Sequence, residues 1–338
     1  MIDPHRRRPR YPGKNPRRFE EKYKELAPEK YPGTVAKVLA SGKTPAGSHV
    51  PVMVAEVLAA LSPQAGETVV DCTLGHGGHA EAILGRILPG GHLLGLDVDP
   101  EELPRAESRL RALGFGTDVL EVKKSNFAGL SGALASWGVG LADCILADLG
   151  VSSMQLDAPR RGFSTKFPGP LDMRMNPARG RSAAQLLKKI SAGALGALLL
   201  ENADEPRAEI LSHALAGKDF SGTADLSRAV CAALGFLLEA EQEKSVRRVF
   251  QALRIEVNEE FGALDTLLRV LPSCLKPGGR VAILTFHSGE DRRVKKAFQA
   301  GVRNGQYAGI SDSVTRPSAE ECRSNPRATS AKLRWACR

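Results

Sequence analysis

The chain has 338 residues, enough for one large domain or two modest ones. Its apolar fraction of 42% and charged fraction of 25% are typical of a globular protein. No apolar stretch approaches the roughly 18 residues of a membrane helix, and no apolar segment follows the N-terminal charges, so we expect neither a membrane span nor a secretory signal. The six cysteines lack metal-ligand spacing and several lie in apolar runs, which favours reduced thiols in a cytoplasmic protein.

The net charge of +9 is concentrated near the start of the chain. Residues 1–48 hold twelve Lys or Arg against five Asp or Glu, interleaved with prolines and tyrosines and without helical periodicity. We interpret this segment as a basic, flexible arm that neutralises nucleic-acid phosphates. A solvated tail and an organelle transit peptide are the alternatives, although the acidic residues and few serines argue against a transit peptide.

From residue 49 onward the pattern predicts alternating helices and strands. Apolar residues at helical spacing predict a helix within 51–61. Short β-type runs predict strands at 68–72, 92–97, 119–122 and 142–148. Strands that alternate with helices indicate βαβ units and therefore a parallel sheet.

The alternation stops near residue 156. A loop rich in proline and glycine leads into Ala- and Leu-rich helical stretches, so we expect a helical insertion between two strands. An apolar stripe from Phe250 to Leu271 then predicts one long helix, and the runs 280–286 and 331–338 predict two further strands. We therefore expect three parts: an arm at 1–48, a sheet domain at 49–155 and 246–338, and an inserted helical domain at 156–245.

A glycine-rich turn follows the first predicted strand. Gly75, Gly77 and Gly78 let the backbone approach a ligand closely just before a helix begins. Asp97 ends the next strand, where a carboxylate can accept two hydrogen bonds from ribose hydroxyls. A dinucleotide and S-adenosylmethionine both fit this outline, and a purely structural turn is the third possibility. Asp71 favours S-adenosylmethionine, because its carboxylate would repel a pyrophosphate but suits a sulfonium and an ammonium group.

The segment ILADLGVSSMQLD (145–157) begins as a buried strand and reaches Asp148 at the tip of that strand. A carboxylate in this position is costly to desolvate unless it has a partner. Small and hydroxylated residues follow it directly: Gly150, Ser152 and Ser153.

Seven segments occur in the order typical of the bacterial RsmH (MraW) family, which the chain resembles from about His49 to its C-terminus. They are DCTLGHGGH, DLGVSSMQLD, RGFS, GPLDMRM, FQALRIEVNEE, LKPGGRVAILTFHSGEDR and NPRATSAKLR. The resemblance implies a class I (Rossmann-like) methyltransferase sheet with an inserted all-helical substrate-recognition domain. It also implies methylation, with S-adenosylmethionine, of the exocyclic N4 of a cytidine in the decoding centre of 16S rRNA in the small ribosomal subunit.

The resemblance also assigns residues to the cofactor and the reaction. Cofactor contacts are implied for Gly77, Gly78, His79, Asp97 at the ribose, Phe127 against the adenine, Asp148 and Gln155. Asp148 would in addition stand between the cofactor and the target amine. There it could accept a hydrogen bond from N4 and orient the amine, which makes it the candidate catalytic residue.

Five residues are candidates for substrate contact: Ser152, Ser153, Arg174, Asn258 and His287. Arg174, Asn258 and His287 each have a plain structural alternative. Arg174 can pair with Asp172, Asn258 can cap a nearby loop, and His287 can bond within the protein. No metal is expected, since His76 and His79 lack a third ligand at a suitable spacing.

Two positions depart from the family pattern, Gly289 where a leucine is usual and Thr329 where a basic residue is common. Three rival functions stay open: the same chemistry on another RNA or on a protein, a non-catalytic ribosome-assembly factor, and a NAD-linked oxidoreductase. The oligomeric state is also open, with a homodimer as one option.

Overall fold

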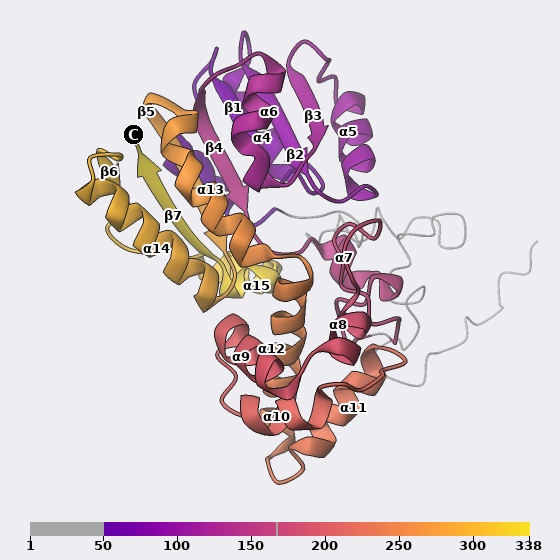
Figure 1. Cartoon of the computed structure of the whole chain (residues 1–338). Helices are drawn as coiled ribbons and strands as arrows, with labels where there is room; N and C mark the ends of the chain where they lie inside the picture. Colours follow the sequence, from indigo (N-terminus) through magenta and orange to yellow (C-terminus); the bar gives the residue numbers. More distant parts are fainter. Residues whose placement is uncertain (1–50, 167) are drawn as a thin grey trace, which may run out of the picture. The chain divides into compact units, whose positions relative to one another are not determined.

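The computed structural model describes residues 51–166 and 168–338, so the predicted arm at 1–48 lies outside the described residues. Its centre is a seven-stranded sheet in the order β3-β2-β1-β4-β5-β7-β6 (Figure 1). The strands are β1 (Thr68–Asp71), β2 (His92–Asp97), β3 (Leu120–Lys124), β4 (Ala142–Asp148), β5 (Leu275–Thr285), β6 (Gly309–Ile310) and β7 (Lys332–Cys337). The first five strands pair in parallel, whereas β7 runs antiparallel to β5 and β6. The predicted Rossmann-like α/β sheet is therefore confirmed, although β5 begins at Leu275 rather than at residue 280.

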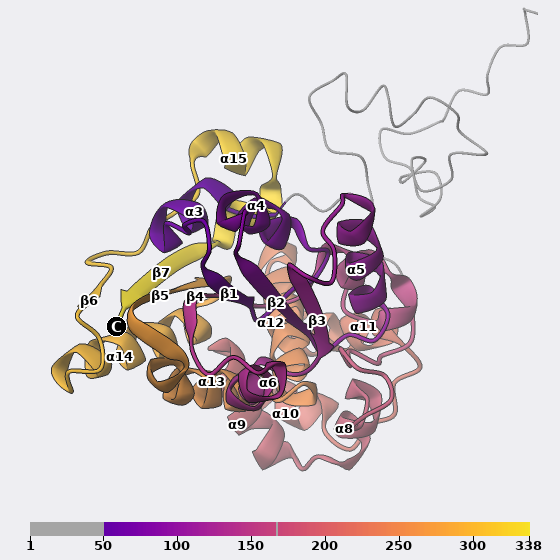
Figure 2. The same cartoon turned by 90° about the horizontal axis from the view of Figure 1, so that it is seen from above.

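Helices cover both faces of this sheet (Figure 2). One face carries α3 (Val54–Leu61), α4 (Gly78–Ile87) and α5 (Glu102–Ala112), and the other carries α6 (Leu130–Trp137), α13 (Glu260–Cys274) and α14 (Ser288–Arg303). Strand β4 shows why two layers form, since its side chains alternate between the faces. Ile145 and Ala147 pack into one buried cluster, while Cys144 and Leu146 pack into the other. A strand buried on both sides reads as a continuous apolar run, as residues 144–147 do.

Between β4 and β5 the chain forms a group of helices with a buried cluster of its own. They are α7 (Ser153–Asp157), η3 (Pro159–Arg161), α8 (Ala183–Lys189), α9 (Ala192–Ala203), α10 (Ala208–Leu215), α11 (Thr223–Ala233) and α12 (Glu239–Val257). The described residues between these two strands contain no further strand, as the pattern predicts. The remaining short elements are η2 (Phe127–Gly129), α15 (Ala319–Ser324) and η4 (Pro326–Ser330).

The prediction of a single long helix from Phe250 to Leu271 is wrong. Helix α12 ends at Val257 and α13 begins at Glu260, with the intervening Glu259 in the left-handed region at a φ of 51°. The apolar stripe is real, but it serves two cores: Phe250 packs among the inserted helices and Leu271 packs against the sheet. The predicted domain boundary at 245/246 falls inside α12, and the division into domains itself stays a prediction.

All six cysteines are free, and Cys72, Cys144 and Cys274 are buried, in agreement with the prediction of reduced thiols. Within the described part of the chain, no helix combines the length and the apolarity that crossing a membrane requires.

Candidate active site

Three carboxylates gather at the carboxyl ends of adjacent parallel strands, where α/β sheets of this kind bind ligands. Asp71 ends β1, Asp97 ends β2 and Asp148 ends β4, and the sheet order places β1 between the other two strands. Asp71 is fully buried and the Asp148 side chain is 17% exposed. Each of the three lies close enough to a neighbouring carboxylate to feel its charge.

Backbone N–H groups hold this cluster in place. The Asp97 carboxylate accepts hydrogen bonds from the N–H groups of Gly75 (2.8 Å) and Asp99 (2.9 Å). Asp71 accepts one from Thr73, whose hydroxyl in turn accepts the N–H of Asp148 at 2.6 Å. Oδ1 of Asp148 is buried and has no hydrogen-bond partner. An orphaned carboxylate oxygen of this kind is costly, which indicates that it is kept for a ligand.

The cluster also lacks a cationic side chain. No Lys or Arg among the described residues forms an ion pair with Asp71, Asp97 or Asp148. Burial, reinforced by neighbouring carboxylates, raises the pKa of Asp71 to about 7 and that of Asp148 to about 8. Burial raises the pKa of Asp97 as well. Electrostatically, the site is therefore built for a positively charged ligand and against an anionic one.

His79 lies against this cluster as a neutral side chain. Its Nε2 lies 2.9 Å from the carbonyl oxygen of Val52, which can only accept, so Nε2 carries the proton. Nδ1 then presents a lone pair, 3.7 Å from Oδ2 of Asp148. Burial lowers the pKa of His79 to about 4, so the imidazole does not neutralise the carboxylates near pH 7.

The predicted glycine turn joins β1 to α4. Gly77 precedes the helix with a φ of 80°, and a Cβ there would lie 2.9 Å from Cδ1 of Leu110. At Gly78 a Cβ would lie 2.8 Å from Cγ of Pro51. Both positions therefore require glycine for backbone geometry or close packing, in addition to any contact with a ligand.

The residues after β4 are bound tightly within the protein. Ser152 caps α7. Its hydroxyl accepts the backbone N–H of Gln155 (3.1 Å), and the side-chain Oε1 of Gln155 accepts the backbone N–H of Ser152 (3.0 Å). The Gln155 amide nitrogen donates to Asp99 at 2.7 Å. Ser153 is the first residue of α7. The cofactor contact of Gln155 and the substrate contacts of the two serines stay predictions.

Phe127 is the remaining predicted cofactor residue. It begins the short helix η2 just after β3, at the same edge of the sheet as Asp97. Its ring is partly buried against the cluster that α6 and α13 form on the sheet. A stacking contact with adenine fits this placement and stays a prediction.

Two predicted substrate residues hold a loop of the insertion. Arg174 pairs through two nitrogens with Asp172, both at 2.8 Å, which is its structural alternative. Asn258 lies between α12 and α13, accepts the N–H of Met175 (2.7 Å) and donates to the carbonyl of Met173 (2.8 Å). The loop is thus held by side chains, and Arg174 itself is tied to Asp172 with a side chain that is 22% exposed.

Arg161 is a residue of this site that the sequence motif RGFS contains but does not single out. Its side chain is only 4% exposed and pairs with the fully buried Asp99 at 2.8 Å. The sequence around Arg161 gives no sign of such burial, because its partner lies 62 residues earlier in the chain.

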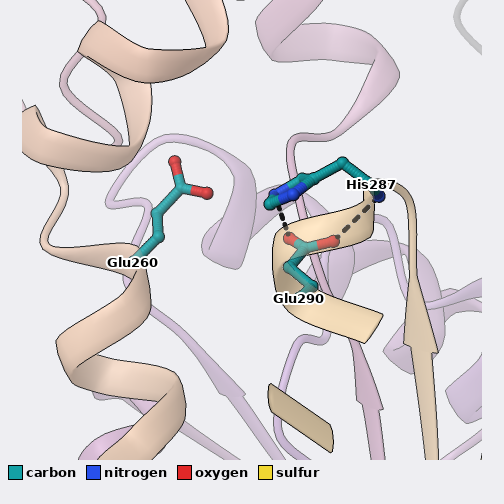
Figure 3. Close-up of side chains that lie close together, drawn as sticks. All are labelled: Glu260, His287 and Glu290. Carbon is teal, nitrogen blue, oxygen red and sulfur yellow. Dashed lines mark hydrogen bonds and ion pairs between the residues drawn. The ribbon is translucent and has the colours of Figure 1, made fainter. Parts of the chain in front are cut away.

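His287 follows β5 and faces two glutamates, as Figure 3 shows. Its Nε2 lies 3.1 Å from Glu290 without good hydrogen-bond alignment, and the Glu290 carboxylate also accepts the N–H of Phe286 at 2.8 Å. Glu290 raises the pKa of Asp148, which places this group beside the strand-end carboxylates. Substrate contact by His287 stays a prediction.

Glu260, His287 and Glu290 are close enough to share a metal ion, since their ligand atoms lie within 4.8 Å of one another. The guanidinium of Arg254 already supplies a positive charge to this cluster. Its guanidinium binds both oxygens of Glu260 at 2.8 Å, and with His287 it holds the pKa of Glu290 below its usual value although burial opposes this. A divalent cation beside this guanidinium would be repelled, so the cluster gives no support for a metal site.

Gly289 shows how the protein fills the space of the leucine that is usual there. A Cβ on Gly289 would lie 2.6 Å from Cζ of Phe261. The Phe261 ring is buried, contacts the His287 ring at 5.7 Å between centroids, and carries the Arg293 guanidinium 4.0 Å from its centroid. The packing contact is therefore replaced rather than lost.

Comparison of the sequence with protein families and with individual proteins gives the same result. Residues 46–338 match the model of the MraW methylase family. Ribosomal RNA small subunit methyltransferase H 2 of Alkaliphilus metalliredigens is 51% identical, over 98% of this chain and 97% of that protein. The corresponding enzymes named H 1 of Lachnoclostridium phytofermentans and Agathobacter rectalis are each 49% identical, over 98% and 99% of this chain and 93% and 98% of theirs.

Solved structures give only a weak likeness. An rRNA methylase from Streptococcus thermophilus is 12% identical with a TM-score of 0.39, over 85% of this chain and 94% of that one. A score this low adds nothing to the fold, which rests on the strand order of the sheet.

Proposed function

Because the chain belongs to the MraW methylase family, we propose that it methylates N4 of a cytidine in 16S rRNA, within the small ribosomal subunit, with S-adenosylmethionine as methyl donor. The names of its relatives support a small-subunit rRNA substrate. The observation that carries the proposal is the cluster of Asp71, Asp97 and Asp148, one fully buried and two partly buried, at three adjacent strand ends without a cationic partner among the described residues.

This cluster fits the proposed cofactor. When bound, S-adenosylmethionine supplies an electrophilic methyl group on a sulfonium, and its ammonium group is a second positive charge. Asp97 would accept the ribose hydroxyls, as a carboxylate does at this position of a Rossmann-like sheet. Asp71 ends the strand that leads into the turn at Gly77 and Gly78. From there its charge would attract the cationic end of the cofactor. The same charge repels a pyrophosphate, which argues against the rival NAD-linked oxidoreductase.

Asp148 would act on the acceptor. The lone pair of a cytosine N4 is delocalised into the ring, so the amine is a poor nucleophile until it is held and rotated. Oδ1 of Asp148 is unpartnered and can accept a hydrogen bond from the amine. Ionised Asp148 would stabilise the positive charge that develops on nitrogen and could take up the proton that nitrogen then loses. His79, neutral and fixed by Val52, keeps its Nδ1 lone pair toward Asp148 and can share that proton.

Recognition of RNA would fall to the inserted helices and the loop that presents Arg174. A base must leave its stack to reach Asp148, and it would enter past Ser152 and Ser153, which follow Asp148 in the chain. A cytoplasmic location follows from the proposed substrate. A non-catalytic assembly factor is disfavoured, because such a role does not require three uncompensated carboxylates at the strand ends.

The test uses small ribosomal subunits from a strain that lacks this enzyme, incubated with the protein and methyl-labelled S-adenosylmethionine. Digestion of the RNA and mass spectrometry should find the label in N4-methylcytidine. Label in another nucleoside or in a protein would overturn the substrate and keep the cofactor. Binding of NADH in place of S-adenosylhomocysteine would overturn both.

A further inference from the structure

Arg161 is a charged side chain buried at the junction of two loops. A guanidinium carries its charge at every physiological pH, and burial of that charge is costly without a partner. The partner is Asp99, whose Oδ2 lies 2.8 Å from Nη2, with exposures of 4% for the arginine side chain and 0% for the aspartate. The same oxygen accepts the Gln155 amide at 2.7 Å.

On one side, Arg161 is connected to the proposed cofactor site. Asp99 lies two residues beyond Asp97, and its N–H donates to Oδ1 of Asp97 at 2.9 Å. Asp97 is the carboxylate expected to bind the ribose. A ligand that fixes Asp97 therefore also fixes the backbone that carries the Asp99 side chain.

On the other side, Arg161 holds the loop of residues 173–175, here termed the Arg174 loop. Nη2 donates to the carbonyl oxygens of Arg174 (3.1 Å) and Met175 (2.8 Å). Met173 has a φ of 63°, a conformation that a side chain such as methionine adopts only when its surroundings enforce it. Asn258 also bonds to the backbone of this loop. The side chains of Arg161 and Asn258 therefore hold a backbone that no regular secondary structure holds.

We propose that Arg161 is a positioning residue that couples the cofactor site to the Arg174 loop, so that cofactor and RNA strengthen each other's binding. The inference rests on the proposed function, because it takes the Arg174 loop as an RNA contact. Coupling between two binding sites is reciprocal: if the cofactor raises RNA affinity by some factor, RNA raises cofactor affinity by the same factor.

The experiment measures the Kd of unmethylated small subunits with and without saturating S-adenosylhomocysteine. For the wild-type protein we expect at least about fivefold tighter binding when the cofactor product is present, the lower end of usual coupling. In Arg161→Lys the charge beside Asp99 remains, but the ammonium lies one bond nearer the backbone than Nη2, the nitrogen that contacts Asp99 and both carbonyl oxygens, so it falls short of this position. The ratio should fall below about twofold, while the Kd for S-adenosylhomocysteine alone stays within about threefold of the wild-type value.

The neighbouring Arg160→Lys is the matched control. Arg160 is exposed, pairs with Glu101 and makes no hydrogen bond or ion pair with the described residues of the Arg174 loop, so its coupling ratio should stay at the wild-type value. A second variant separates positioning from folding. Asp99→Asn/Arg161→Met removes both buried charges, so it should melt at a higher temperature than Arg161→Met alone, yet still show no coupling.

Two results would overturn the inference: equal RNA affinity of the wild-type protein with and without S-adenosylhomocysteine, or full coupling in Arg161→Lys. Either could occur while N4-methylcytidine still forms, which would leave the proposed function intact. Conversely, coupled binding without N4 methylation would contradict the proposed reaction but support the proposed role of Arg161.

Discussion

At the scale of single residues, the proposed reaction depends on Asp148 as both a charge and a hydrogen-bond acceptor. In Asp148→Asn the side chain keeps its shape but can neither take the negative charge nor accept a proton. We expect kcat for methyl transfer to fall about 100-fold or more, as for the loss of one stabilising group in other enzymes. The Kd for S-adenosylhomocysteine, measured by calorimetry, should change by less than about threefold. A variant with full turnover would show that Asp148 has no role in the reaction.

The raised pKa values of Asp71 and Asp148 predict a pH-dependent stability. In the unfolded chain both carboxyls titrate near 3.8, whereas in the folded protein they titrate near 7 and 8. Between these values the folded state holds protons that the unfolded state has released, so the free energy of unfolding falls as pH rises. His76 and His79 act in the opposite direction, but only below about pH 6.5.

The Tm of the cofactor-free protein should therefore fall between pH 6.5 and 8, and Asp148→Asn should show a smaller fall. Added S-adenosylmethionine should raise the Tm more at pH 8 than at pH 6.5, because its positive charges compensate the ionised carboxylates. Calorimetric scans across this range test both statements. Parallel slopes for the wild-type protein and the variant would contradict them.

At the scale of elements, the packing of α13 against α14 turns on one glycine. Gly289→Ala would place a methyl group against the Phe261 ring in a full core, and such overpacking costs about 1–3 kcal/mol. Phe261→Leu removes the ring atom that would clash, so in the double variant Gly289→Ala should cost less than it does alone. Chemical denaturation of the four proteins measures this difference. Equal costs in both backgrounds would mean that the ring moves aside freely.

The loop that follows the Arg174 loop carries two arginines that we expect to contact RNA phosphates. Arg179 and Arg181 lie there with exposed side chains, and neither makes a hydrogen bond or ion pair through its side chain to another described residue. If each contacts one phosphate, Arg179→Ala/Arg181→Ala should lower the salt slope of RNA binding by about 1.4, the value for two single-strand contacts. Arg228→Ala, at an exposed arginine paired with Asp225 on α11, should leave the slope unchanged. An unchanged slope in the double variant would place the RNA elsewhere.

For the whole molecule, the core clusters explain how one chain combines a rigid sheet with a separate helical layer. Two clusters sandwich the sheet and a third lies among the inserted helices, which are joined to the sheet domain at both ends, between β4 and α7 and between α12 and α13. Side-chain contacts reinforce these connections, since Asp204 after α9 binds Ser288 and Arg292 of α14. The predicted N-terminal arm lies outside the described residues, and its binding to RNA stays a prediction.

The sequence by itself determined the parallel part of the sheet and the point at which the alternation of strands and helices stops. Apolar runs bounded by glycine and by Asp71, Asp97 and Asp148 mark strands and their ends, because a buried parallel strand has a local signature. The end of that signature near residue 156 marks the insertion. The glycine turn and the strand-end carboxylates could be located for the same reason, since each follows a strand directly.

Only the tertiary structure decided which polar side chains gather at the strand ends and which are bonded to distant parts of the chain. The break between α12 and α13 could not be read from a stripe that remains apolar on both sides of it, because the stripe does not say which core it packs into. Arg161 with Asp99, Asn258 with Met173, and Phe261 with Gly289 are pairs distant in sequence. Burial of a charge or an amide depends on both members of such a pair, and a local pattern contains only one.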